Sequence, residues 1–107
     1  MAYLIKADNS KIIEIVGEGP KKTLTLEQMQ KAVGGYVETI PFKVPKGLKD
    51  TELKKTKLPN GIMILDEEGK LKNYLENERA TNLTRGIVAD DDKIMGDVLI
   101  CSNEELD

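Results

Sequence analysis

The fold is decided by the stretch TLEQMQKAVGGYVETI, residues 25–40, where a helical pattern changes into a strand pattern across two glycines. Thr25 and Gln28 have the spacing of a capping box, in which each side chain satisfies a backbone donor at the start of a helix. Apolar residues then recur at helical spacing and predict a stripe that can face a sheet: Leu26, Met29 and Val33. Gly34 and Gly35 predict the helix end, because glycine readily adopts the left-handed conformation of a C-terminal cap.

Strand character resumes directly after the glycines, at residues 36–40. Alternation predicts two faces, with Tyr36, Glu38 and Ile40 on one and Val37 and Thr39 on the other. Pro41 and Pro45 follow, and proline lacks the amide hydrogen that a central strand needs. We therefore expect this strand near an edge or at an end of the sheet.

Four further segments have the composition of strands: residues 2–6, 11–16, 62–66 and 97–101. A short second helix is expected at about residues 77–84. The strands and helices do not alternate along the chain as they do in parallel α/β folds. The sequence therefore predicts one domain, residues 1–107, with an α+β fold. We expect a mostly antiparallel sheet of about five strands, with the main helix, at about residues 25–34, packed on one face.

The composition predicts a globular domain with an aliphatic core and a charged surface. The chain has 107 residues, of which 39% are hydrophobic but only 4% are aromatic. A net charge of −3 weighs against nucleic acid as a partner, because nucleic-acid-binding domains are typically basic. The charge is nevertheless uneven, since residues 43–57 hold six lysines and residues 90–107 hold seven carboxylates. We expect a lysine-rich loop at residues 46–60 and a frayed acidic tail at residues 102–107.

The cysteine content is typical of a reducing compartment. Cys101 is the single cysteine, so no disulfide can form within the chain. It lies in an apolar run, and no histidine is present to activate it, so we expect a buried, inert thiol. No leader sequence is evident, and the longest apolar runs are far shorter than a membrane span. The expected location is the cytoplasm, with no membrane partner.

Most catalytic and metal-binding chemistry lacks its usual residues in this chain. The absence of histidine removes the commonest general base and metal ligand. The glycines at positions 17, 19, 34 and 35 do not have the spacing of a phosphate-binding loop. Asp90-Asp91-Asp92 could attract a hard cation, but the run lacks the spacing of a calcium loop, and a solvated loop is the favoured interpretation. The sequence predicts no enzyme activity, no catalytic residue, no metal and no cofactor.

The most specific polar cluster is NERAT, residues 77–81. Arg79 could grip a phosphate or a carboxylate, with Asn77 and Thr81 adding oriented hydrogen bonds. The structural alternative is that Asn77 or Thr81 caps a short helix while Arg79 pairs with an internal carboxylate. Residue types alone leave ligand binding and capping both open.

Tyr36 and Glu38, which share one face of the predicted strand, complete the candidate binding residues. Gly34 and Gly35 could let a ligand approach the backbone, and Tyr36 could stack on that ligand. The favoured alternative is that the two glycines only end the helix.

Four short segments, taken in order, carry a resemblance: LEQMQKAVGGYVE (26–38), DEEGKLKN (66–73), NERAT (77–81) and GDVLIC (96–101). Their order resembles a family of small proteins of unknown function that are common in phages, plasmids and other mobile elements of bacteria. The resemblance covers about three quarters of the chain. It implies an accessory protein of a mobile element and implies no activity.

These observations predict a non-enzymatic accessory protein of a bacteriophage or mobile element that binds a host protein or a small anionic ligand. Counter-defence is one role that such a protein would suit, and a homo-oligomer is compatible with a sheet edge or an exposed helix face. The alternative is a nucleic-acid-associated protein or DNA mimic, which would act through the basic residues 43–57 or the acidic tail.

Overall fold

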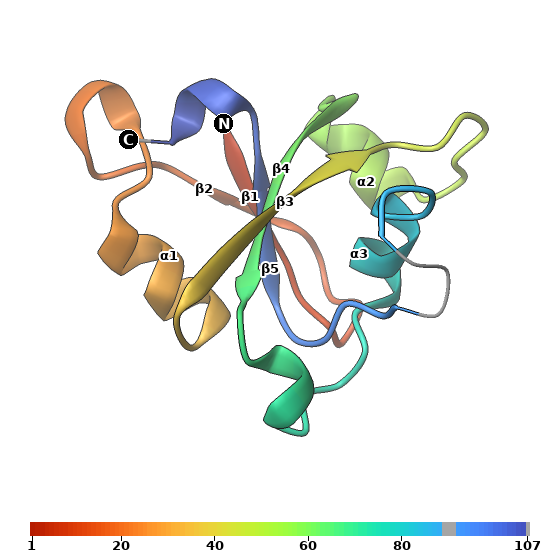
Figure 1. The fold of residues 1–107 in the computed structure, drawn as a ribbon. Helices are drawn as coiled ribbons and strands as arrows, with labels where there is room; N and C mark the ends of the chain where they lie inside the picture. The colour runs from red at the N-terminus through yellow and green to blue at the C-terminus, as the bar shows by residue number, and fades with distance from the viewer. Residues whose placement is uncertain (89–91, 107) are drawn as a thin grey trace.

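One antiparallel sheet forms the centre of the fold (Figure 1). The computed structural model describes residues 1–88 and 92–106. Five strands lie in the order β2-β1-β5-β4-β3, and every neighbouring pair is antiparallel. The strands are β1 (Ala2–Ile5), β2 (Ile13–Ile15), β3 (Val37–Lys43), β4 (Asn60–Asp66) and β5 (Val98–Cys101). The predicted α+β class, with a five-stranded antiparallel sheet, is confirmed.

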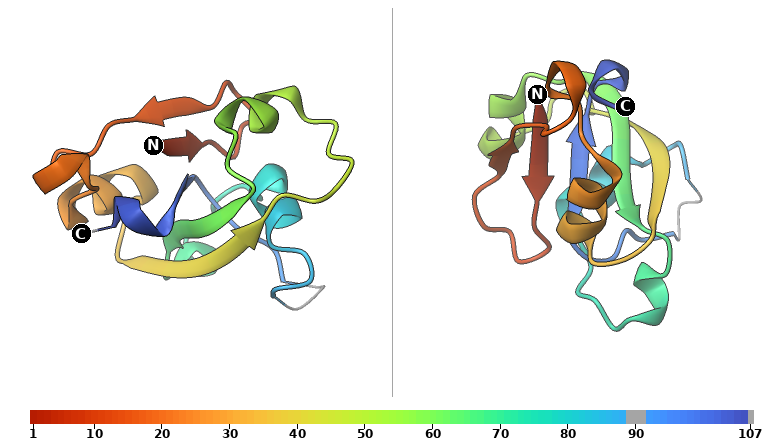
Figure 2. Two further views of the ribbon diagram at one scale, coloured as in Figure 1. Left: turned by 90° about the horizontal axis from the view of Figure 1, so that it is seen from above. Right: turned by 90° about the vertical axis from the view of Figure 1, so that its left-hand side faces the viewer.

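Three helices cover the two faces of this sheet (Figure 2). They are α1 (Leu26–Val33), α2 (Thr51–Thr56) and α3 (Glu78–Leu83), and three short 3-10 turns lie at Pro20–Lys22, Gly69–Leu71 and Asn103–Glu105. The expected capping box opens α1, with Thr25 and Gln28 each bonding to the other's backbone amide. Gly34 closes α1 in the left-handed conformation, with φ of 91°. Among the described residues, no helix is long and apolar enough to cross a membrane.

The alternation of side chains along the strands produces two hydrophobic clusters, one on each face. One cluster joins Met63, Leu65 and Ile100 to α2 and α3. The other joins Ile64 and Leu99 to α1. Val37 packs in the α1 cluster and Ile40 against the opposite one, as the predicted alternation requires. The main helix α1 thus packs on one face, as predicted, and α2 and α3 cover the other face.

β3 forms one edge of the sheet, which fits the expectation from its prolines. The amide of Glu67 bonds to the Tyr36 carbonyl and the amide of Val44 to the Pro59 carbonyl. Because antiparallel bonding alternates along a strand, the backbone N–H and C=O groups of the even-numbered residues of β3 point toward β4, and those of the odd-numbered residues point away. Pro41 therefore faces the open edge, where its missing amide hydrogen leaves no ladder bond unmade.

Three sequence expectations differ from the structure. Leu26 does not join Met29 and Val33 against the sheet, because it lies in the first turn of α1 and is 56% exposed. Residues 46–60 are not a continuous loop, because α2 forms within them around the buried Leu53, with the Asp50 side chain capping its first amides. Of the tail expected to be frayed, Asp107 lies outside the described residues, and residues 102–106 have a defined structure. They form a 3-10 turn, and the Glu105 carbonyl accepts a 2.7 Å hydrogen bond from the Leu24 amide, which ties this tail to the start of α1.

Candidate functional site

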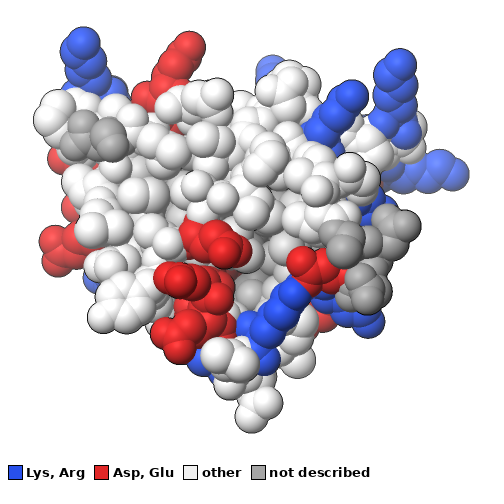
Figure 3. Space-filling model, viewed as in Figure 1, with Lys and Arg blue, Asp and Glu red and all other residues white. Residues whose placement is uncertain are grey.

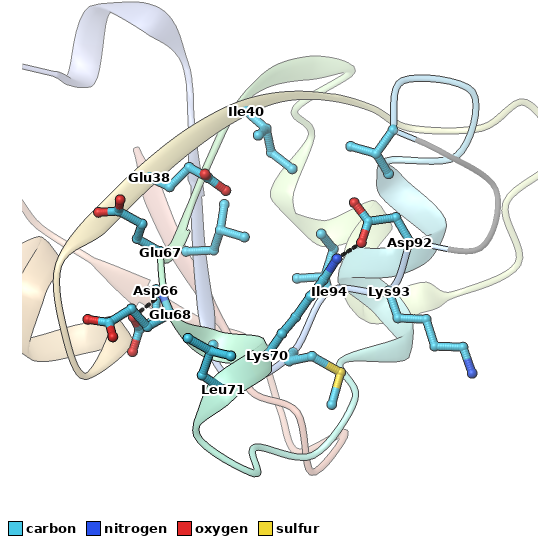
Figure 4. Close-up of a pocket in the computed structure, with 14 residues that line it drawn as sticks. Glu38, Ile40, Asp66, Glu67, Glu68, Lys70, Leu71, Asp92, Lys93 and Ile94 are labelled. Carbon is cyan, nitrogen blue, oxygen red and sulfur yellow. Dashed lines mark hydrogen bonds and ion pairs between the residues drawn. The ribbon is translucent and has the colours of Figure 1, made fainter.

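A cavity of about 330 Å³ opens beside β3, on the face of the sheet that carries α2 and α3 (Figure 4). Its floor is apolar and comes from three parts of the chain: Ile40 of β3, Leu65 of β4 and Ile94 before β5. Ile40 and Leu65 project here because they occupy the same face of the pleated sheet. The cavity is therefore a by-product of the alternation that builds the core.

Carboxylates occupy one side of the cavity's mouth. Glu38, Glu67 and Glu68 are all exposed, and none forms an ion pair with another described residue. Figure 3 shows acidic side chains gathered on this part of the surface, and Figure 4 places these three together on one side. Like charges that lie close together favour the approach of a positive group.

An ion pair closes the opposite side of the mouth. Lys70 reaches across from the turn after β4 and pairs with Asp92 (Figure 4). Lys93 points away from the cavity, and its Nζ lies 3.7 Å from a carboxylate oxygen of Glu76. Both lysines near the mouth thus have acidic partners, and the three glutamates keep the mouth acidic.

The buried carboxylate of Asp66 organises the turn that carries this rim. Asp66 Oδ2 accepts hydrogen bonds from Lys72 Nζ at 2.8 Å and from Tyr74 Oη at 3.0 Å. Asp66 Oδ1 accepts a third bond, at 2.9 Å, from the amide of Glu68. Burial disfavours the charge on Asp66, but these three donors outweigh it and hold the pKa of Asp66 below its usual value. The hydrogen bond to Asp66 in turn raises the pKa of Lys72 and that of Tyr74.

Gly35 makes room for this cluster. A Cβ atom on Gly35 would lie 2.5 Å from Lys72 Nζ and 2.7 Å from Asp66 Oδ2, closer than real Cβ contacts. Lys72 Nζ also lies 3.3 Å from the Gly34 carbonyl, so the lysine joins the end of α1 to the end of β4. The glycine pair after α1 therefore ends the helix and also permits this close approach.

The segment at residues 69–75, here named the projecting turn, stands out from the rest of the fold at the bottom of Figure 1. Lys70, Lys72 and Tyr74 bind back to the protein. Leu71 and Leu75 alternate with them and are left 80% and 69% exposed. Leu71 also lines the cavity. We use the name cavity face for Leu71 together with the three rim glutamates, Glu38, Glu67 and Glu68.

Asn77 is fully buried and caps α3. Its Oδ1 accepts a 3.1 Å bond from the Ala80 amide, and its Nδ2 donates to the carbonyls of Ile5 and Gly96 at 2.9 and 3.0 Å. The sequence left open whether Asn77 binds a ligand or caps a short helix, and in the structure it caps the helix. In this conformation Asn77 has no surface on which to meet a ligand.

Arg79 also has internal partners. Its Nε donates to Asp50 Oδ2 at 2.8 Å, and its Nη1 donates to the Ser10 carbonyl at 2.8 Å. The Arg79 side chain is only 16% exposed. An anionic ligand would have to displace Asp50 to reach it.

Thr81 supports the cavity from behind. Its Oγ1 accepts a 3.0 Å hydrogen bond from the Ile94 amide, and the Ile94 carbonyl accepts a 2.8 Å bond from the Asn77 amide. Ile94 forms part of the cavity floor. Asn77 and Thr81 of the predicted NERAT site therefore hold Ile94 of the cavity floor in place, although neither of them lines the cavity.

Glu38 is the one predicted site residue on the cavity face. Tyr36 is 67% exposed but lines a different hollow, against the end of α1. Tyr36 and Glu38 thus line neighbouring hollows that share Glu68, and Asn77, Arg79 and Thr81 line neither of them. Asp90 and Asp91, considered for a cation site, lie outside the described residues, whereas Asp92 pairs with Lys70. No group of three or more acidic or cysteine side chains is placed to hold a metal ion in the described part of the chain.

Sequence reasoning gave no role to Asp66, Glu67, Glu68 or Leu71. A usable signal exists at residues 66–72, where three carboxylates are followed, after Gly69, by two lysines that flank Leu71. That pattern indicates a segment with one anchored side and one exposed side. The buried position of Asp66 has no local signal, since nearby Glu67 and Glu68 are exposed.

Comparison with known proteins places this architecture in a family. A domain of unknown function, DUF3846, matches residues 2–107. The chain belongs to the DUF3846 family. No curated protein and no solved structure matches it. Membership of this family agrees with the resemblance to a family of unknown function.

Proposed function

We propose that the protein is a non-catalytic binding protein that docks on a partner protein through the cavity face. The observation that carries this proposal is the combination of three rim carboxylates with an apolar floor and the exposed Leu71. Interfaces between proteins commonly join an apolar centre to a polar rim. The partner would supply basic side chains to the rim and an apolar socket for Leu71.

The chemistry of the cavity supports binding over catalysis. A general acid or base works best when its pKa lies near the operating pH. The hydrogen bonds at Asp66 move its pKa and that of Lys72 away from neutrality, in opposite directions. These groups are suited to holding the projecting turn in place.

The electrostatics of the rim favour a basic partner over the small anionic ligand expected from the sequence. Glu38, Glu67 and Glu68 would repel an anion, and Arg79 is already bound to Asp50. Origin in a phage or other mobile element, which the sequence resemblance suggests, would make the partner a host protein. Counter-defence through that host protein is part of this proposal.

Affinity capture from a bacterial lysate with three baits tests the proposal. The first bait is the wild-type protein, and the second carries Glu38→Gln, Glu67→Gln, Glu68→Gln and Leu71→Asp. The third is a matched control with the same kinds of change at exposed positions elsewhere: Glu14→Gln, Glu18→Gln, Glu104→Gln and Leu26→Asp.

The expected result is at least one protein that the wild type and the control recover equally and the cavity-face variant loses at least about tenfold, as for loss of an interface hot spot. Binding of that purified protein would then be measured by calorimetry. A set of captured proteins that does not change with the cavity-face variant would contradict the proposal.

A further inference from the structure

We propose that the lysine surface, formed by Lys43, Lys46, Lys49, Lys54, Lys55 and Lys57, binds the phosphate backbone of a double-stranded nucleic acid. This site is separate from the cavity face and does not depend on the function proposed for it. Three features support this assignment: α2 separates its charges, no large hydrophobic side chain is exposed between the lysines, and the nearby carboxylates have partners within the fold.

The six lysines lie within a stretch of fifteen residues, and all six are exposed. Figure 3 shows basic side chains standing out from the part of the surface where Figure 1 places α2. Among the described residues, only Lys55 of these six forms an ion pair, with Glu52. The surface therefore presents several positive charges to solvent without local compensation.

The two carboxylates of the same region are used internally. Asp50 caps α2 through the amides of Glu52 and Leu53 and accepts the 2.8 Å bond from Arg79. Glu52 binds Lys55 at 2.9 Å and accepts a 3.2 Å bond from the Ile12 amide. Leu53 and Thr56 are buried, which turns Lys54, Lys55 and Lys57 outward. The fold thus turns the carboxylates of Asp50 and Glu52 toward partners in the protein and the lysine ammonium groups toward solvent.

The surroundings of the lysines favour a polyphosphate over a membrane or a protein. The large hydrophobic side chains that are exposed in the described structure all lie outside residues 43–57. Membrane-surface helices and protein interfaces both need apolar contact beside their charges. Val44, Leu48 and Leu58 pack inward against the core instead.

The lack of aromatic contacts favours a duplex over a single strand. Proteins that bind single strands stack bases on exposed aromatic rings. Phe42, the aromatic residue nearest in sequence, is 2% exposed, and the exposed Tyr36 lies against the end of α1. Backbone phosphates of a duplex require only positive charge in a suitable array.

Net charge does not oppose this assignment, because the charges are separated in space. The rim glutamates lie at the far end of β3 from Lys43, the first residue of the lysine surface. A polyanion would therefore approach with the lysine surface forward and the cavity face directed away. Binding of this kind is sequence-independent and depends strongly on salt.

Fluorescence anisotropy with labelled twenty-base-pair DNA and RNA duplexes, at 50 and 200 mM KCl, tests the assignment. The lysine-surface variant carries Lys46→Gln, Lys49→Gln, Lys54→Gln and Lys57→Gln. The control carries Lys6→Gln, Lys21→Gln, Lys22→Gln and Lys31→Gln, so both variants have the same net charge. Urea unfolding of each variant checks that the fold is kept.

With about four phosphate contacts, affinity of the wild type should fall about 100-fold between the two salt concentrations. The lysine-surface variant should lose at least about tenfold in affinity at 50 mM, and the control less than about threefold. The cavity-face variant should bind the duplexes as the wild type does. Relative affinity for the DNA and RNA duplexes identifies which source of phosphate the surface prefers.

Three outcomes would overturn the assignment. They are no duplex binding at 50 mM KCl, an equal loss in the lysine-surface variant and its control, or tighter binding to a single strand or to vesicles of anionic phospholipid. The cavity-face variant is tested separately. A failure of duplex binding would therefore leave the proposed partner-binding function unaffected, and a failure of partner capture would leave the duplex-binding assignment unaffected.

Discussion

Asp66 Oδ2 and Lys72 Nζ lie 2.8 Å apart and join the end of β4 to the base of the projecting turn. The Asp66 side chain is 1% exposed and that of Lys72 is 35% exposed. A buried carboxylate thus meets an ammonium group that still reaches water. The contact fixes the turn that presents Leu71 and the rim glutamates, so the cavity face depends on it.

Replacing Asp66 with Asn should destabilise the fold while leaving its shape intact. The change removes the charge that binds Lys72 and weakens the bond to Tyr74, and hydrogen bonds to charged groups contribute about 2 kcal/mol each. We expect a loss of about 2–3 kcal/mol in the free energy of unfolding, measured in urea. Glu68→Gln, on the exposed rim, is the control and should change stability by less than about 0.5 kcal/mol.

The contribution of Asp66 should depend on pH in the acid range. The pKa of Asp66 is lowered in the folded protein, so the unfolded chain takes up its proton first as the pH falls. The stability that Asp66 contributes is complete above the unfolded pKa of about 3.9 and is lost as the pH falls through the lower folded pKa. The difference between wild type and Asp66→Asn should be constant above about pH 5 and shrink below about pH 4. A difference that grows on acidification would contradict this cause.

Asn77→Ala should be among the more destabilising substitutions in the chain. It removes the α3 cap and leaves the buried carbonyls of Ile5 and Gly96 without their donor. We expect a loss of about 3 kcal/mol in the free energy of unfolding. Asn77→Asp keeps the cap acceptor but aims a charge at two carbonyls, so it should not restore stability. Asn82→Ala, in the same helix, is the control, and equal stability of both alanine variants would disprove the capping role.

Arg79→Ala should affect stability rather than partner binding. Arg79 is bound to Asp50 and to the Ser10 carbonyl, and loss of such a partly exposed pair costs about 1 kcal/mol. A double-mutant cycle with Asp50→Asn would measure the coupling between the two side chains. If Arg79→Ala kept full stability but abolished capture of the partner, the ligand-binding interpretation of NERAT would be correct instead.

The thiol of Cys101 should be unreactive in the folded protein. Cys101 is 0% exposed, and burial raises its pKa from 9.0 to about 11. Only the thiolate reacts with a disulfide reagent, so at pH 8 we expect reaction at least about 100-fold slower than in concentrated urea. Rapid labelling of the native protein would show that β5 opens readily, because Cys101 lies within that strand.

Some parts of the fold could be predicted because their cause is local. The capping box at Thr25 begins α1 and the glycine at position 34 ends it, and each acts through residues next to it in the sequence. Pro41 indicated an edge strand, since only an open edge tolerates a missing amide hydrogen. Asn77 was recognised as a cap candidate for the same reason, because its acceptor lies three residues from the amide that it binds.

Other parts depend on distant contacts that leave no local pattern. α2 has one strongly apolar residue, Leu53, so no helical stripe announces it, and its stability depends on burying Leu53 in the core beside α3. Arg79 was seen as a ligand-binding candidate because its partner Asp50 lies 29 residues away in the sequence. The lysine-rich loop and the acidic tail looked unstructured because the contacts that order them are also made with residues far away in the sequence.

The sequence by itself determined the class of the fold, the main helix, the strands and the aliphatic nature of the core, because each follows from periodicity and turn chemistry within a short window. The tertiary structure alone decided that Asp66 is buried while Glu67 and Glu68 line a rim, and that the lysines and the glutamates occupy separate surfaces. These arrangements arise where β3, β4 and the projecting turn meet, and a side chain's exposure there is set by neighbours far away in the sequence.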